Sequence, residues 1–487
     1  MITVFLAAAL VFGSSTEAPF EVLSTGDSPP WSVFRAIEQA ISTSPRVEAQ
    51  NEVWIEARAS LAESRTGLLP RLDVLGQYTR LSEIDNDPLV ALDFDVAAAR
   101  AGLDQVADPA ARAILDAQIE AQAQATNIAI TVPQNQWLFR ASVAYPVSAL
   151  FFEILPGIRA QSDVAKAREV EVDVVRNALA FEVTTAYFAH ARARSAGVVA
   201  AQSKARAERD LAQAEAQKRN GRGSLPDVLR FRARLAEAEA ELAQRKAAVS
   251  SSATRLRALL HVDNRGVFAF EERLDEPPEL DEALMSLSVE DAFSRRDELA
   301  VFDSLATSQA AAASAALGDA LPKLEVSAGF DYANPNLLFT PPVEEFRDNY
   351  TVSGVLSWSI DGAFAATQRA EARSASKRRF EAQALDLRDQ IRAEFERARS
   401  EYQAAFEIFA AAKRQREAAN EAYRARVAGY EAGLFDATSL IDSELDATRA
   451  SFALVDAGAT LRVRYFDFAR ASGVHLWELE AVEQAAK

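Results

Sequence analysis

Hydrophobic and polar residues alternate with a period of two in four short stretches of the sequence. In the clearest stretch, residues 350–361, one face carries Tyr, Val, Gly, Leu, Trp and Ile, and the other face is mostly Ser, Thr and Asp. This period is that of a β-strand whose two faces meet different surroundings. The pattern predicts strands at about 70–81, 135–149, 322–333 and 349–361.

These strands are long enough to cross a lipid bilayer obliquely, because twelve residues span about 40 Å. An apolar face with Trp and Tyr near its ends, opposite a polar face, is typical of outer-membrane strands. For a single strand, a soluble sheet with one face on a core is the better interpretation; four such strands attached to long helices favour the membrane. The aromatic residues expected at the membrane interface are Tyr78, Trp137, Tyr145, Tyr332, Tyr350 and Trp358.

Very long helices follow the strands. Between Ile158 and Asn220 there is no Pro, and the single Gly is Gly197. Some sixty residues at about 1.5 Å each make a rod of about 90 Å, and helices of this length with apolar residues in heptad register pack as coiled coils. The long helices are expected at about 157–220, 225–261, 364–430 and 437–470, and shorter ones at 46–66 and 294–317.

The chain is an internal duplication. Residues 69–74 align with 321–326 at an offset of 252, and residues 221–256 align with 433–468 at an offset of 212. In the second alignment, five apolar positions recur every seven residues in both copies. The first half therefore holds about 40 extra residues, expected as an insertion at 82–133. The expected organisation is a first repeat at 19–262, a linker at 263–293, a second repeat at 294–475 and a C-terminal tail at 476–487.

Four strands cannot close a membrane barrel, since transmembrane barrels begin at about eight strands. Open strand edges are not tolerated in lipid, so other copies of the chain would have to complete the barrel. The predicted fold class is mainly α with a membrane β-barrel contribution: a duplicated chain of four β-strands and very long coiled-coil helices.

Composition narrows the chemistry. The 487 residues include no Cys, which excludes disulfides and thiol nucleophiles, and three His, which leave little for a histidine metal site. The formal charge of −18 argues against nucleic acid as a partner. No constellation converges on a carboxylate pair such as Glu344 and Glu345, so an enzyme is the least favoured function. A structural coiled-coil protein of the cell envelope remains an alternative, although it leaves the four strands unexplained.

The N-terminus carries a short apolar run at residues 2–12, followed by small residues up to Ala18. This pattern predicts a secretory signal peptide at 1–18; the alternative is a fraying N-terminal helix. No stretch approaches the roughly 18 consecutive apolar residues that a membrane-spanning helix requires.

The order of these elements resembles the TolC-like outer-membrane efflux proteins, also called outer membrane factors. The markers are Gly-Leu-Leu-Pro-Arg-Leu at 67–72, its copy at 320–324, Gly-Ser-Leu-Pro-Asp-Val-Leu at 223–229, and Gly433 with Ser-Leu-Ile-Asp at 439–442. The resemblance covers about residues 30–475. It implies a homotrimer with a twelve-stranded barrel in the outer membrane and an α-helical tunnel in the periplasm.

The resemblance also implies a function. A chain of this family is the passive exit duct of a tripartite efflux or type I secretion system, with neither cofactor nor enzymatic activity. Its partners are a periplasmic adaptor (membrane fusion) protein, an inner-membrane pump and outer-membrane lipid. The exported substrate is selected largely by the pump, so the sequence does not identify it.

In this family the gate lies at the periplasmic turns between paired long helices, where aspartates form rings. By position these aspartates fall on Asp227, Ser439 and Asp442, so Ser439 departs from the acidic pattern. Three copies of Asp227 or Asp442 would make a carboxylate ring that favours cations. For Asp227, which follows Pro226 in the first helical turn, a helix-capping role is the alternative. The residues expected to shape the tip and to contact the adaptor are Gly221, Gly223, Gly433, Arg222 and Arg230.

The insertion at 82–133 is acidic, with a helix expected at 104–124. It would lie at the extracellular mouth of the channel, because the loops that connect the strands lie opposite the helices.

Overall fold

The computed structural model describes residues 31–82, 95–125, 133–262, 273–276, 282–339 and 343–479. The predicted signal peptide and parts of the predicted insertion, linker and tail lie outside these residues. The chain forms two compact units. The first, which we call the helical unit, comprises Met1–Ser60, Gln161–Ser308 and Ala375–Lys487; the second, the sheet unit, comprises Leu61–Ala160 and Gln309–Ser374.

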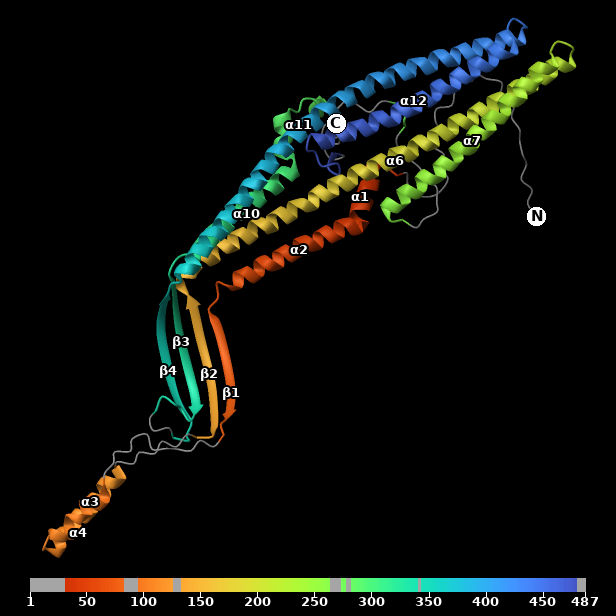
Figure 1. Cartoon of the computed structure of the whole chain (residues 1–487). Helices are drawn as coiled ribbons and strands as arrows, with labels where there is room; N and C mark the ends of the chain where they lie inside the picture. Colours follow the sequence, from red (N-terminus) through yellow and green to blue (C-terminus); the bar gives the residue numbers. More distant parts are fainter. Residues whose placement is uncertain are drawn as a thin grey trace, which may run out of the picture. The chain divides into compact units, whose positions relative to one another are not determined.

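The sheet unit is built on one four-stranded antiparallel sheet (Figure 1). Its strands lie side by side in chain order. The fold class predicted from the sequence, four strands joined to very long helices, is therefore confirmed. The strands are β1 (Arg71–Arg80), β2 (Asn135–Pro146), β3 (Lys323–Asn334) and β4 (Arg347–Ser357).

The register of the sheet gathers most hydrophobic positions of the four strands on one face. Leu72 lies opposite Val143, Val143 lies opposite Ala328, and Ala328 lies opposite Val352. Successive side chains of a strand point to opposite faces, so the polar residues between these positions share the other face.

Two strands end earlier than their alternation suggested. β2 stops at Pro146 rather than at 149, because the proline nitrogen cannot donate to a strand ladder. β4 stops at Ser357 rather than at 361. Ser359 begins the next helix instead: its Oγ accepts a hydrogen bond from the backbone N–H of Gly362 at 3.0 Å, which is the bond of a helix N-cap.

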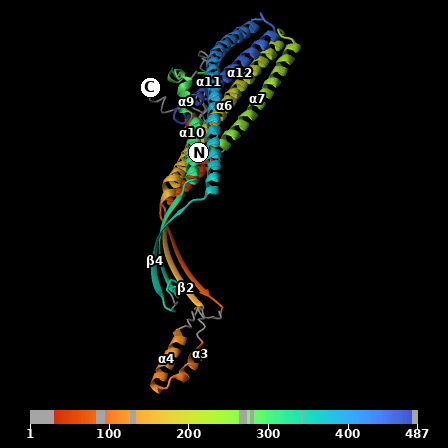
Figure 2. The same ribbon diagram turned by 60° about the vertical axis from the view of Figure 1, so that its left-hand side comes forward.

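Long helices make up most of the rest of the chain (Figures 1 and 2). In both views α6 runs beside α7 and α11 beside α12, and each pair is joined by a short turn. Among the described residues no helix is both long enough and apolar enough to span a membrane. The long helices are α6 (Leu155–Arg219, 65 residues), α7 (Leu225–Leu260, 36 residues), α11 (Ile360–Glu431, 72 residues) and α12 (Ala437–Ala471, 35 residues). The shorter α2 (Pro45–Thr66) precedes β1, and α10 (Asp297–Gly318) precedes β3.

Short helices occupy segments for which the sequence predicted none. They are α1 (Val33–Thr43) before α2, α5 (Val147–Ala149) after β2, α8 (Glu282–Met285) within the predicted linker, and α9 (Val289–Arg295), which begins in that linker and ends two residues beyond it. The insertion holds α3 (Val96–Ala101), a 3₁₀ turn η1 (Leu103–Gln105) and α4 (Pro109–Ala125), not one helix at 104–124. Pro109 suits the first position of a new helix.

The duplication appears in the sheet as two equivalent hydrogen bonds. The hydroxyl of Tyr145 donates to the carbonyl oxygen of Leu68 at 3.4 Å, and Nε1 of Trp358 donates to the carbonyl oxygen of Ala320 at 3.1 Å. Ala320 lies 252 residues after Leu68, as in the sequence alignment, and Trp358 lies 213 residues after Tyr145. Each bond fixes the end of the second strand of its repeat to the segment before the first strand.

A π-turn accounts for one extra residue that the first half has between the end of β2 and the end of α6. The difference in residue number between equivalent positions of the two repeats is 213 at Tyr145 and Trp358. It is 212 at the ends of the long helices, where α6 ends at Arg219 and α11 ends at Glu431. The first half therefore has one additional residue between these points. It also has the π-turn η2 (Leu150–Ile154), and a π-turn is how a helix accommodates a single inserted residue.

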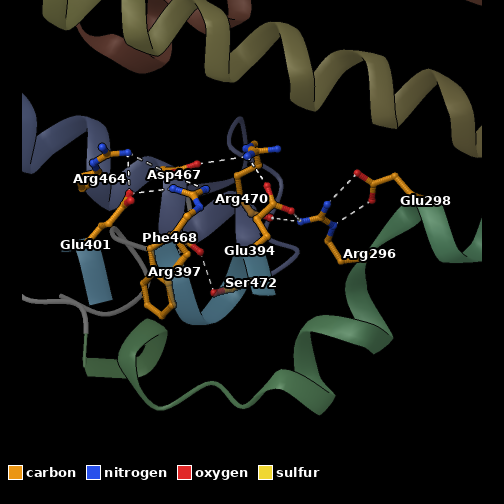
Figure 3. Close-up of polar contacts among 10 residues, drawn as sticks. All are labelled: Arg296, Glu298, Glu394, Arg397, Glu401, Arg464, Asp467, Phe468, Arg470 and Ser472. Carbon is orange, nitrogen blue, oxygen red and sulfur yellow. Dashed lines mark hydrogen bonds and ion pairs between the residues drawn. The ribbon is translucent and has the colours of Figure 1, made fainter. Parts of the chain in front are cut away.

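A charged network lies beside the aromatic core of the helical unit (Figure 3). Asp467 is buried and lies within 3.6 Å of three arginines on α11 and α12. Glu394 bridges Arg470 at 2.5 Å and Arg296 at 3.0 Å. Burial alone would raise the pKa of Glu394, but these two arginines outweigh burial and hold it below its usual value. The members are Arg296, Glu298, Glu394, Arg397, Glu401, Arg464, Asp467 and Arg470.

Candidate functional site

The hydrophobic face of the sheet is open rather than covered. Val74 and Tyr350 are 88% and 84% exposed, and Leu72, Val352 and Leu356 are exposed nearly as much. A contiguous apolar surface across four strands is far larger than the scattered hydrophobic residues of an ordinary protein surface. It therefore requires a partner, which is either lipid or another protein surface.

Aromatic side chains lie at both ends of this face. At the loop end, the rings of Tyr78 and Trp137 lie 4.5 Å apart, and the rings of Tyr332 and Phe346 stack at 4.9 Å. Tyr350 lies opposite Phe330, two residues further from the loops than the Tyr332–Asp348 pair. The six aromatic residues expected at a membrane interface therefore all lie on the exposed face, or, for Trp358, directly after the strand on the same side. Tyr145 and Trp358 lie at the end of the sheet from which the long helices continue.

The opposite face of the sheet is polar. Arg140 on β2 makes two hydrogen bonds to Asp331 on β3, at 2.6 and 3.0 Å, and the hydroxyls of Ser327 and Ser353 lie 2.9 Å apart. A cavity of about 210 Å³ lies over this face, between these strands and the segment 335–338 that follows β3. Charged, amide and hydroxyl groups on this face suit contact with water.

The two outer strands of the sheet each have a partner on one side. Among the described residues β1 pairs with β2 alone, and β4 pairs with β3 alone. Each outer edge therefore presents a row of backbone N–H and C=O groups that can accept another strand.

In the helical unit, each pair of long helices is joined by the same kind of turn. Gly221 and Gly433 both have φ of +75°, a conformation that strongly favours glycine. The backbone N–H of Arg222 donates to the carbonyl oxygen of Gln217 at 2.9 Å, and that of Leu434 donates to Gly429 at 2.8 Å. These bonds close a Schellman motif at each helix end.

The two turns start their second helix with the same capping pair in opposite order. In the first repeat, Ser224 caps α7, and its Oγ donates to a carboxylate oxygen of Asp227 at 2.5 Å. In the second repeat, Asp436 caps α12 by accepting from the backbone N–H of Ser439 at 3.0 Å. Hydrogen bonds to Ser439 hold the pKa of Asp436 below its usual value. The acidic residue that was expected at position 439 thus lies three residues earlier, at Asp436.

Asp442 lies one turn further into α12 and is exposed. In the described part of the chain it makes no hydrogen bond or ion pair. Its counterpart in the first repeat is Arg230, which donates to Oγ1 of Thr438 at 3.0 Å and so links the two turns. Arg222 is exposed, and a Cβ on Gly223 would lie 2.9 Å from the backbone nitrogen of Lys218. The turn therefore requires glycine at 223, whereas Asp442 stays exposed on the surface of α12.

Behind the tip, a buried ion pair joins the two helix pairs. Arg234 on α7 and Glu444 on α12 approach to 2.6 Å, and their side chains are 8% and 2% exposed. Glu444 also accepts hydrogen bonds from Ser203 at 2.8 Å and from Thr448 at 2.7 Å. Sequence analysis missed this pair, because 210 residues separate its members and neither belongs to a local motif.

A second polar contact joins the same two helix pairs. The hydroxyl of Tyr423 on α11 lies 3.2 Å from both carboxylate oxygens of Asp210 on α6. Burial raises the pKa of Asp210 to about 6, although its bond to Tyr423 lowers it. Around this contact, the rings of Phe231 and Tyr430 pack at 5.7 Å in a small hydrophobic cluster. The tip is therefore held by a few specific contacts between the two repeats.

No group of three or more His, Cys, Asp or Glu side chains that could hold a metal ion occurs within the described ranges. No family model and no curated protein sequence matches this chain.

Solved structures match the chain over almost its whole length. The outer-membrane channel OprN has 17% sequence identity and a TM-score of 0.70, with 91% of this chain and 90% of that chain covered. CusC, a transmembrane channel, has 14% identity and a TM-score of 0.71, with 91% and 92% covered. The CmeC outer membrane channel of Campylobacter jejuni has 13% identity and a TM-score of 0.69, with 100% and 98% covered. At these identities the likeness establishes a common fold.

Proposed function

We propose that this chain, which has the fold of the TolC-like outer-membrane channels, is the exit duct of an efflux or type I secretion system. Three copies form the channel in the outer membrane, and their long helices extend into the periplasm. Substrates pass through it without chemical change.

The observation that carries this proposal is the sheet with an exposed apolar face, a polar face and two outer edges that have no strand partner among the described residues. An apolar face of this size suits lipid, and a polar face suits a water-filled lumen. Each unpaired backbone group in lipid costs several kcal/mol, so β1 and β4 need partners there. Three copies of the four-stranded sheet supply twelve strands, enough to close a barrel.

The turns at 219–225 and 431–437 form the periplasmic tip of the channel. We assign the aperture ring to Asp442, whose exposed carboxylate makes no hydrogen bond or ion pair with the residues that the structure describes. Asp227 and Ser439 serve chiefly in capping their helices, which reduces their part in the lining. A ring of three carboxylates attracts cations and repels anions at the narrowest point.

The same tip suits contact with a periplasmic adaptor protein. Gly221, Gly223 and Gly433 keep the turns tight, and Arg222 and Arg230 add charge near the turn. Leu434 is exposed beside them, so the surface offers both apolar and cationic contacts. An inner-membrane pump, reached through the adaptor, would supply the energy for export.

The mass of the protein extracted from membranes by detergent tests the proposal. Light scattering corrected for bound detergent should give a protein mass near three times the 53.0 kDa of one chain, in the outer-membrane fraction. A water-soluble monomer or dimer would contradict it and would favour the structural coiled-coil alternative.

A further inference from the structure

We propose a specific pairing between β4 of one copy and β1 of the next, in which Gly354 lies opposite Tyr78, Val355 opposite Gln77, and Leu356 opposite Gly76. This seam rests on the proposed trimer, and it defines which residues of a second copy each edge strand meets.

The first step is that β1–β2 and β3–β4 are copies of one hairpin, with the same register. Arg71 lies opposite Ala144 in the first, and Lys323 lies opposite Ser357 in the second. Lys323 follows Arg71 by 252 residues and Ser357 follows Ala144 by 213. These offsets are those of the paired aromatic hydrogen bonds from Tyr145 and Trp358.

The second step is that the contact between β2 and β3 joins one hairpin to the next. In a closed ring of three chains, β4 meets β1 of the neighbouring copy in the same way, because β4 corresponds to β2 and β1 to β3. The observed pairs Ala141–Phe330, Ser142–Gly329 and Val143–Ala328 then translate into the three pairs proposed for the seam.

The side chains at this seam are complementary in size. Gly354 has no neighbour within 4 Å of a Cβ position in one chain, and the seam places the ring of Tyr78 beside it. The large Leu356 meets Gly76. An aromatic ring across from a strand glycine covers the backbone that the glycine leaves bare.

The alternation of side chains between the two faces limits the other possible registers of the seam. A shift of one residue would turn the apolar face of one strand into the lumen, so only shifts of two residues keep both faces intact. Two of these competing registers are Val355 opposite Leu75, and Val355 opposite Asp73, in which the strand ends are flush. The duplication selects Gln77 over both.

The proposed register implies a steep inclination of the strands. A row of directly opposed residues runs across the sheet from Leu72 through Val143 to Ala328. The counterpart of Ala328 in β1 is Gly76, four residues after Leu72. The row therefore shifts by four residues along the strand direction for every two strands that it crosses. At about 3.3 Å per residue and 4.8 Å between strands, the strands incline by about 54° to the barrel axis, more than the usual 35–45°. A strand of 12 residues such as β3, about 40 Å long, then rises about 23 Å, close to the apolar band of about 25 Å in outer-membrane barrels.

Cysteine pairs test the seam, and the absence of native Cys makes them free of background. The full-length chain carries Val355→Cys together with Gln77→Cys, Leu75→Cys or Asp73→Cys, all on the polar face and so accessible to a water-soluble oxidant. A disulfide needs Cα atoms within about 7 Å, which directly opposed residues satisfy. Within one chain, β2 and β3 separate the two cysteines, so a bond must join two copies.

We expect the Val355→Cys/Gln77→Cys variant to shift from one-chain to three-chain mass on a denaturing gel after oxidation, and to return on reduction. The other two variants and each single-cysteine variant should stay at one chain. Bonding of the Leu75 or Asp73 variant instead, or of none in a protein whose native mass is three chains, would overturn the register and leave the trimer intact. A native mass of one chain would overturn the proposed function as well.

Discussion

Replacing Glu444 by Gln should loosen the contact between the two helix pairs, because it leaves a buried arginine without its counter-charge. Glu444 and Arg234 are almost completely buried and 2.6 Å apart. Removing one member of a buried ion pair costs about 3–5 kcal/mol. Glu237, which is exposed and 3.8 Å from Arg234, would compensate part of the charge, so we expect about 3 kcal/mol, the lower end of that range.

Hydrogen exchange of backbone amides in the detergent-solubilised full-length protein measures this loss. Amides of α7 and α12 around the pair open locally, and a loss of about 3 kcal/mol accelerates their exchange by roughly 150-fold. The matched control is Glu241→Gln, whose partner Arg245 lies one helical turn away on the surface at 2.7 Å. Such an exposed pair contributes about 0.5 kcal/mol or less.

A double replacement separates charge from packing. Glu444→Leu combined with Arg234→Met removes both charges, so exchange should return to within about tenfold of the native rate. Equal exchange in the Glu444→Gln and Glu241→Gln variants would refute the reasoning, since it would mean that the buried carboxylate does not clamp the two helix pairs.

Three further predictions concern the pore, a charged histidine and the insertion. Asp442→Asn should weaken cation selectivity in the reversal potential of single channels, and Asp227→Asn should change it much less, because Ser224 already engages Asp227; equal effects would contradict the assignment. Hydrogen bonding to Asp297 raises the pKa of His475 to about 9, although burial lowers it. The charged histidine therefore contributes up to about 3 kcal/mol of stability below pH 6.5, and this contribution is lost as pH rises through 9. The thermal unfolding temperature of the His475→Gln variant should not show this loss between pH 6.5 and 9. Deletion of residues 90–125 should leave the native mass at three chains, and a monomer would show that the insertion is needed for assembly.

The sequence was informative wherever the signal is local. Alternation of period two marked the four strands, and heptad repeats without Pro marked the long helices, because each pattern reflects which side of its own element is apolar. The two offsets of the duplication likewise follow from the sequence alone. The alignment at 212 even places Ser224 against Asp436, so the reversed capping pair could have been read from it and explains the missing acid at Ser439.

The tertiary structure decided the features that depend on contacts between distant residues. The sequence by itself determined four two-faced strands, paired long helices and their repetition, because backbone hydrogen bonding and burial impose a fixed period on each element. Only the folded chain decided that Arg234 meets Glu444, that η2 absorbs the extra residue of the first half, and that Asp442 stays exposed. Partner choice across 200 residues depends on which faces meet, and no period along the chain encodes that meeting.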